Sequence, residues 1–299
     1  MNKEIKTEKY GYFIAFCGGF ILSFDVALIR AINLSSEQVS FWRSLSLSLP
    51  MICITIYSIL SKRKKINKDM IFNKDVMLSS IFYGISSILF PVSAMLTSIA
   101  NMLFIISTAP LWAGLFSWIF IREPINKVTF FSFTISLAGV LVVIFGSQQG
   151  FSFNPSVGDI TALLTAITMA AAFVVGRSSK KNLTLSPSIG AIMSAIILYI
   201  FFDINFTIPV HKLSLVFLEG AIVVFIALSL VAKASRFIPS SHLGLFLLLE
   251  TILGPLWVYL FFDEIPNIYA IIGGSVIFLA LLVNSAHSIY MLNTKSSAT

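Results

Sequence analysis

Apolar residues run along this chain in stretches of about 20, separated by short polar connections. A helix of about 20 apolar residues is long enough to cross the hydrocarbon core of a bilayer. The pattern therefore predicts an all-α integral membrane protein with ten transmembrane helices. The expected spans are 10–29, 38–60, 76–96, 101–121, 128–146, 158–176, 188–203, 213–232, 240–262 and 268–289.

The composition supports a membrane environment for the whole chain. Hydrophobic residues make up 57% of the 299 positions and charged residues only 11%, with a mean hydropathy of +0.94. Soluble domains carry about 25% charged residues. A water-soluble fold is thus excluded. The first apolar run lacks a small-residue cleavage pattern, so it is interpreted as a retained span rather than a signal peptide.

The distribution of Lys and Arg predicts the orientation. Ten crossings place both termini on one side of the membrane, and 17 of the 20 basic residues fall on that side. The other side has only Arg30, Arg43 and Lys212. By the positive-inside rule the termini are expected in the cytoplasm, in a plasma membrane of the bacterial inner-membrane type. This asymmetry also accounts for the basic net charge without a nucleic-acid partner.

The two halves of the sequence resemble each other. The stretch Gly11 to Arg30 aligns with Gly158 to Arg177, and "FSWIFIRE", ending at Glu123, resembles "WVYLFFDE", ending at Glu264. Each half holds five spans, an odd number, so the second half must enter the membrane from the opposite side. Inverted repeats of this kind are typical of secondary transporters, whose site lies at the interface between the repeats.

This repeat predicts the domain organisation. We expect a first five-helix repeat over residues 1–147, an outer linker over 148–157, a second repeat over 158–290 and a cytoplasmic tail over 291–299.

At these positions the chain resembles the drug/metabolite transporter superfamily, in particular the EamA-type exporters with their duplicated five-helix unit. The resemblance rests on Gly11 and Gly158, Arg43 in the second span, the Pro110 to Glu123 spacing, and Glu250 fourteen residues before Glu264. Where the family often has Pro after the first of these last two carboxylates, this chain has Thr251. The resemblance implies ten helices, cytoplasmic termini, a central cavity, and export of small metabolites without ATP.

Ionisable side chains at membrane depth are the candidate binding residues, because each needs a partner, a proton or water. Asp25 and Arg43 lie at similar depths on successive antiparallel spans, so they can pair. The alternatives are direct contact of either residue with a substrate, or side chains that extend to the membrane surface.

Two further carboxylates stand inside apolar spans. Glu219 lies in span eight, with no cation evident at its level in the neighbouring sequence, and Glu250 lies near the middle of span nine. Burial favours the protonated form of a carboxyl group, so either residue could alternate between its neutral and charged forms and couple transport to protons. The alternative is a protonated Glu that only bonds across helices.

Trp112 and Trp257 each follow a Pro-Leu pair several turns inside their spans. Proline kinks widen cavities, and a Trp face can hold a cation. These two residues are therefore expected either to line the cavity or to pack between helices.

These features together predict a secondary transporter that exports a small zwitterionic or cationic metabolite, an amino acid or a related amine, by alternating access. The expected partners are this solute, the lipid bilayer and protons, with no protein partner and no nucleic acid. One alternative is an uptake or exchange carrier for a larger cationic metabolite such as a nucleoside-type cofactor. A channel or an intramembrane enzyme is disfavoured. The sequence has no GxSxG, HExxH or Walker motif, so no catalytic residue, metal site or cofactor is expected.

Overall fold

The computed structural model describes residues 2–60, 73–122, 127–147, 150–151, 155–179, 183, 186–234 and 240–297. Each of the ten expected spans coincides with one helix or with a consecutive run of helices. Three segments discussed above lie outside the described residues, at least in part: the basic loop around residues 62–65, the residue Glu123, and part of the 148–157 linker. Within the described part, six helical segments are long and apolar enough to cross a membrane by length and composition, and three shorter helices are apolar as well.

The helices of the first half are α1 (Asn2–Leu22), α2 (Asp25–Ile32), α3 (Ser36–Leu60), α5 (Lys74–Leu96), α6 (Ile99–Ile106), α7 (Ala109–Phe116), η1 (Ser117–Ile121) and α8 (Lys127–Phe145). Two short strands, β1 (Gly146–Ser147) and β2 (Gly150–Phe151), pair antiparallel at the start of the expected linker. The second half contains α9 (Val157–Ser178), α10 (Ser186–Phe201), α11 (Val210–Phe217), η2 (Leu218–Val224), α12 (Phe225–Ala234), α13 (Ser240–Phe262) and α14 (Ile268–Ser297). Helix α14 continues through most of the residues expected to form the tail.

Three expected spans are not uniform α-helices. The first is interrupted at Ser23 and Phe24, between α1 and α2, where the Ser23 hydroxyl donates to the Phe20 carbonyl. The fourth is interrupted before Pro110, which lacks an N–H and therefore begins a new helix more readily than it continues one. The eighth contains the π-helical segment η2, a type of helix that often occurs at functional sites.

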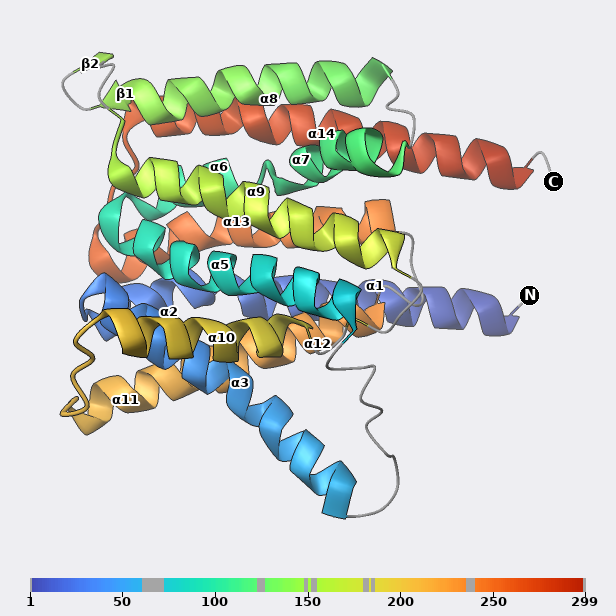
Figure 1. Ribbon diagram of the computed structural model, residues 1–299. Helices are drawn as coiled ribbons and strands as arrows, with labels where there is room; N and C mark the ends of the chain where they lie inside the picture. The colour runs from blue at the N-terminus through green and yellow to red at the C-terminus, as the bar shows by residue number, and fades with distance from the viewer. Residues whose placement is uncertain are drawn as a thin grey trace.

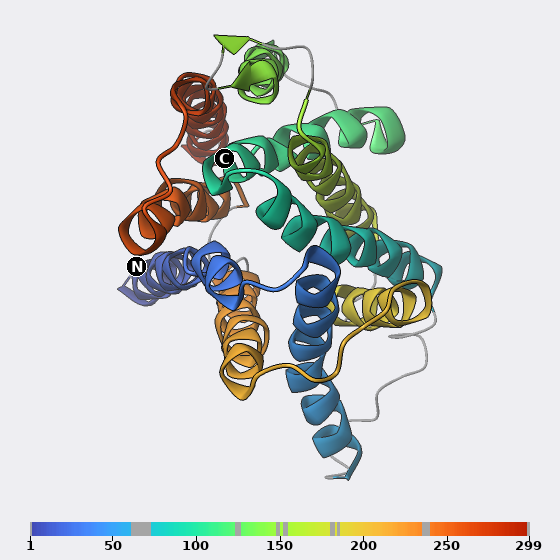
Figure 2. The ribbon, with the colours of Figure 1, turned by 90° about the vertical axis from the view of Figure 1, so that its left-hand side faces the viewer.

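The helices run roughly side by side in one bundle (Figure 1). The beginning of α1 and the end of α14 lie at the same end of the bundle, and β1 and β2 lie at the other. Figure 2, viewed from the end that carries the strands, shows the helices close to end-on. A chain that crosses the membrane an even number of times has both termini on the same side, which agrees with this arrangement.

The packing of the helices reflects the internal repeat. Helix α1 packs on α12 of the second half, and in the same way α9 packs on α5 of the first half. Helices α8 and α14, the last of each half, pack on each other, as do α3 and α10. The largest buried cluster contains residues from both halves, so the core lies between the repeats.

Small residues allow some of these helices to approach closely. Ala162, Ala166 and Ala170 are fully buried on α9, and α8 meets α14 at Gly139 and Gly273. A Cβ atom at Gly273 would lie 2.6 Å from the Gly139 carbonyl oxygen. Without a hydrophobic driving force between helices in lipid, such close backbone contact is a main source of association.

We predict that Gly273→Ala lowers the free energy of unfolding by about 1–3 kcal/mol, the usual cost of overpacking, because the added methyl group overlaps backbone atoms of α8. The thermal midpoint of the detergent-solubilised protein measures this loss. Gly114→Ala is the matched control, since its Cβ would meet only the Thr129 methyl group at 3.6 Å. Equal midpoints for the two variants would show that the α8–α14 contact is looser than described.

Candidate functional site

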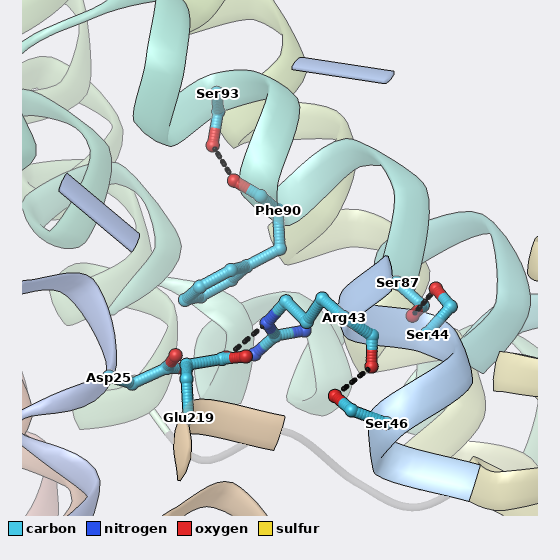
Figure 3. Close-up of polar contacts among 8 residues, drawn as sticks. All are labelled: Asp25, Arg43, Ser44, Ser46, Ser87, Phe90, Ser93 and Glu219. Atoms are coloured by element: carbon cyan, nitrogen blue, oxygen red, sulfur yellow. Dashed lines mark hydrogen bonds and ion pairs between the residues drawn. The ribbon is translucent and has the colours of Figure 1, made fainter. Parts of the chain in front are cut away.

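Arg43 is the centre of a buried ionic cluster. Its Nη2 atom lies 2.8 Å from Oδ2 of Asp25, and its Nε atom lies 2.5 Å from Oε1 of Glu219. The side chains are 7%, 2% and 0% exposed, respectively. We call Asp25, Arg43 and Glu219 the buried triad (Figure 3). It joins the two halves of the chain, because Asp25 and Arg43 belong to the first half and Glu219 to the second.

Each member of the buried triad is placed by a local feature of its helix. Asp25 is the first residue of α2, directly after the interruption of the first span. Arg43 lies about 10 Å along α3 from its start at Ser36. Glu219 lies in the π-helical segment η2. The three residues therefore meet well inside the apolar part of the bundle.

The close approach of η2 to α3 brings Glu219 to Arg43. Gly220 faces Ser46, and a Cβ atom at Gly220 would overlap the Ser46 hydroxyl. The Ser46 hydroxyl in turn donates to the Arg43 carbonyl at 2.9 Å. A larger residue than glycine at position 220 would separate the two segments and lengthen the ion pair.

An aromatic ring covers the guanidinium group. The centroid of the Phe90 ring lies 4.9 Å from Cζ of Arg43, a distance at which a cation is attracted to the ring face (Figure 3). Beside it, the hydroxyl groups of Ser44 and Ser87 are 2.9 Å apart and link α3 to α5. Arg43 is thus held from three sides, by two carboxylates and one ring.

The triad leaves two buried oxygen atoms without a partner. Oδ1 of Asp25 and Oε2 of Glu219 have no hydrogen-bond partner among the described residues. If all three side chains are ionised, the triad also carries one net negative charge. Uncompensated polar and charged groups of this kind are costly in a low-dielectric interior.

Glu250 is the fourth ionisable group of this region. It lies on α13, about 18 Å along the helix from Phe262 and hence near the middle of the span. The side chain is partly buried, and its helix packs on α2, the helix that begins at Asp25. No hydrogen bond or ion pair to Glu250 occurs within the described part of the chain. Glu250 is therefore a carboxylate near the triad that has no partner of its own.

The two tryptophans have different surroundings. The Trp257 ring stacks on Phe24 with centroids 4.8 Å apart, and its Nε1 atom donates to the Ser23 hydroxyl at 2.9 Å. It therefore contacts the interruption that precedes Asp25. Trp112 instead packs edge-on against Phe133 at 5.1 Å. Trp257 thus contacts the two residues that precede Asp25 of the triad, whereas the ring contacts of Trp112 are with Phe116 and Phe133.

The ion pair expected between Asp25 and Arg43 is present. The sequence around Glu219 offers no cation, but the structure supplies one from a distant segment, because Arg43 bonds both carboxylates. Sequence reasoning missed this contact since α3 and η2 are far apart in the chain and meet only through Gly220 and Ser46. It also missed Phe90, which nothing in the sequence distinguishes from the other 27 phenylalanines.

A second ion pair joins the two halves at the end of the bundle that carries the strands. Nε of Arg30 lies 3.0 Å from Oε2 of Glu264, and Oε1 of Glu264 accepts from the Ile99 N–H at 2.9 Å. Arg30 also donates to the Thr97 carbonyl at 2.8 Å. Both side chains are about a quarter exposed. An inverted second half places the end of its fourth span, at Glu264, on the same side of the membrane as Arg30, and this was the indication in the sequence that the two residues could pair.

A hollow among the described residues lies at this end and is lined by Ile99, Ala100, Pro255, Val258, Glu264 and Pro266. It has no interior space that a water molecule could enter, whereas sites for small molecules usually occupy about 300–1,000 Å³. The chemistry of the ionic groups therefore identifies the candidate site better than the hollow does.

The two ion pairs predict very different effects of removing the cation. Arg43→Gln should destabilise the protein by about 3–5 kcal/mol, because it leaves buried carboxylates uncompensated. Arg30→Gln should cost at most about 1 kcal/mol, because its pair is partly hydrated. Thermal unfolding in detergent compares them directly. An Arg43→Gln protein as stable as Arg30→Gln would mean that the triad is open to water.

A model of the EamA-like transporter family matches residues 9–145 and 156–286. Comparison with curated proteins finds no match. One solved structure, described only as a crystal structure of a protein, has a TM-score of 0.58 with 15% sequence identity, over 94% of this chain and 98% of that chain. That likeness concerns the fold alone. Because the family model matches both halves of an all-helical, strongly apolar chain, the protein is a membrane transporter that belongs to the EamA-like transporter family.

Proposed function

We propose that this protein is a secondary transporter that exports a small cationic or zwitterionic metabolite, such as an amino acid or related amine, by alternating access. The observation that carries the proposal is the excess of negative charge at the repeat interface. Two carboxylates, Asp25 and Glu219, bind the single cation Arg43, and a third acid, Glu250, stands on α13, which packs on α2, without a partner in the described structure. A cargo with an ammonium group supplies the missing positive charge.

The position of the charges also supports alternating access. In transporters built from inverted repeats, the substrate site lies at the interface of the repeats near the middle of the bilayer. Glu250 lies at this depth, and the buried triad is contributed by both halves. Movement of one half against the other then changes the surroundings of the site from one side of the membrane to the other.

Trp257 adds an aromatic surface beside this charge. Its contact with Ser23 and Phe24 holds the ring at the interruption of the first span. An indole face attracts a cation, and the attraction is stronger where water is excluded. We assign Trp257 to the cargo site and Trp112 to packing.

Proton coupling belongs to the same proposal. A buried carboxyl group that loses its cationic partner takes up a proton rather than remain charged in a low-dielectric medium. Glu250 can therefore hold the ammonium group of the cargo in one direction and a proton in the other. A larger cationic metabolite, taken up or exchanged, is a second candidate favoured by the same net negative charge.

Counterflow in proteoliposomes tests the assignment. Vesicles loaded with unlabelled amines or amino acids should accumulate the matching labelled solute, and the rate should saturate. Glu250→Gln should reduce this rate by at least about tenfold, since the amide keeps the shape but removes the charge. Glu37→Gln, a carboxylate in the first turn of α3, is the control. A Glu250→Gln protein that transports like the parent would remove Glu250 from the site, and single-channel currents would favour a channel.

The orientation is tested separately. We place both termini in the cytoplasm and the linker between the halves outside. In a protein whose Cys17 and Cys53 are replaced by Ser, an impermeant thiol reagent should label Val157→Cys in intact cells. It should label Tyr10→Cys only after permeabilisation. Both positions are exposed, so labelling of both from outside would contradict the ten-span arrangement.

A further inference from the structure

Two oxygen atoms of the buried triad need a hydrogen atom that no neighbouring donor supplies. Arg43 donates to Oδ2 of Asp25 and to Oε1 of Glu219, so the second oxygen of each carboxyl group is left over. These two atoms, Oδ1 and Oε2, are buried without a partner. Carboxylates are acceptors only, and a carboxyl group becomes a donor when it binds a proton.

The two carboxyl groups bind the same guanidinium group. In Figure 3 both side chains approach Arg43 from the same side. Each keeps one buried oxygen without a partner. One proton shared between the two carboxyl groups supplies the donor that these oxygens lack.

Charge counting leads to the same number of protons. Arg43 carries one positive charge and the two carboxylates carry two negative ones, so the ionised triad is singly negative. Two like charges in contact do not both ionise when water is excluded, and such pairs hold one proton between them. The charged groups that act on the pair within the described chain are Arg43 from α3 and Glu250 from α13. Because Glu250 is another carboxylate, it favours retention of the proton.

We propose that Asp25 and Glu219 bind one proton between them, which makes the buried triad electrically neutral and joins the two repeats through a carboxyl–carboxylate hydrogen bond. Glu250 is then the carboxyl group that remains available to bind a cation. Loss of the shared proton places like charges on opposite sides of the repeat interface. A rise in pH therefore weakens the contact between η2 and α2.

The consequence for transport rests on the proposed function, whereas the proton site itself does not. If the carrier moves amines, protonation of the pair favours the arrangement in which the halves are joined at the triad, and deprotonation favours their separation. The pair thus works as a proton-dependent contact distinct from the cargo group Glu250.

Infrared spectroscopy of the purified, cargo-free protein tests the proton site directly. A protonated carboxyl group has a carbonyl stretching band that shifts in D₂O and disappears on ionisation. We expect one component of this band at neutral pH to be lost in Asp25→Asn and equally lost in Glu219→Gln. In each variant the remaining carboxylate ionises against Arg43. The component should remain in Glu250→Gln, the matched control.

A pH series of thermal midpoints gives a second readout. The wild-type midpoint should fall as pH rises through the release of the shared proton. Glu219→Gln should remove this fall, because its amide N–H replaces the carboxyl proton in the bond to Asp25 at every pH. Glu219→Gln also keeps an acceptor for Arg43, so it is expected to fold.

Absence of the band in the wild type, or its survival in either Asp25→Asn or Glu219→Gln, would overturn the shared proton. Neither measurement requires transport. Saturable amine counterflow without the shared band would leave the proposed function standing and reject this inference. If the shared band is present but the protein moves none of the amines, this inference stands and the proposed function is rejected.

Discussion

The structure depends on the placement of one arginine in a medium that does not tolerate an isolated charge. Arg43 stays ionised in proteins under all ordinary conditions, so its burial requires acceptors. Asp25 and Glu219 supply them, and the Phe90 ring covers the guanidinium group. Removing water from these groups carries a high desolvation cost, which is offset only when α2, α3 and η2 are held together in good geometry. The halves of the protein are therefore joined by a contact that is strong only when it is complete.

Much of this fold follows from the sequence for simple physical reasons. The helix positions follow from the length of apolar stretches that a bilayer requires, and the pairing of Asp25 with Arg43 follows from their equal depth on neighbouring antiparallel spans. The interruption at Ser23 was not predicted, because no proline or glycine marks it. Nor was the π-helical segment at Glu219, since it depends on packing at Gly220 against α3. Periodicity and spacing do not show which segments distant in sequence meet in the fold. They therefore could not predict the contacts of Arg43 with Glu219 and of Trp257 with Ser23.

The two ion pairs that join the halves differ in what they contribute. Arg30 and Glu264 are partly exposed and also bond to backbone groups of Thr97 and Ile99. Water can replace either partner as this contact opens, so its separation costs little. The buried triad has no such replacement unless water or another ion enters. A motion that separates the halves thus meets its main resistance at Arg43 and little at the strand-bearing end.

The interruption of the first span has no equivalent in the other half of the chain. In the alignment that places Arg30 on Arg177, Asp25 corresponds to Ala172, a buried residue where α9 continues without a break. The carboxylate and the broken helix therefore occur together in the first half only. The two halves share an architecture, but only one of them carries this acidic group. In the alternating-access cycle that we propose, the inward and outward states of this single acidic centre are thus not related by symmetry.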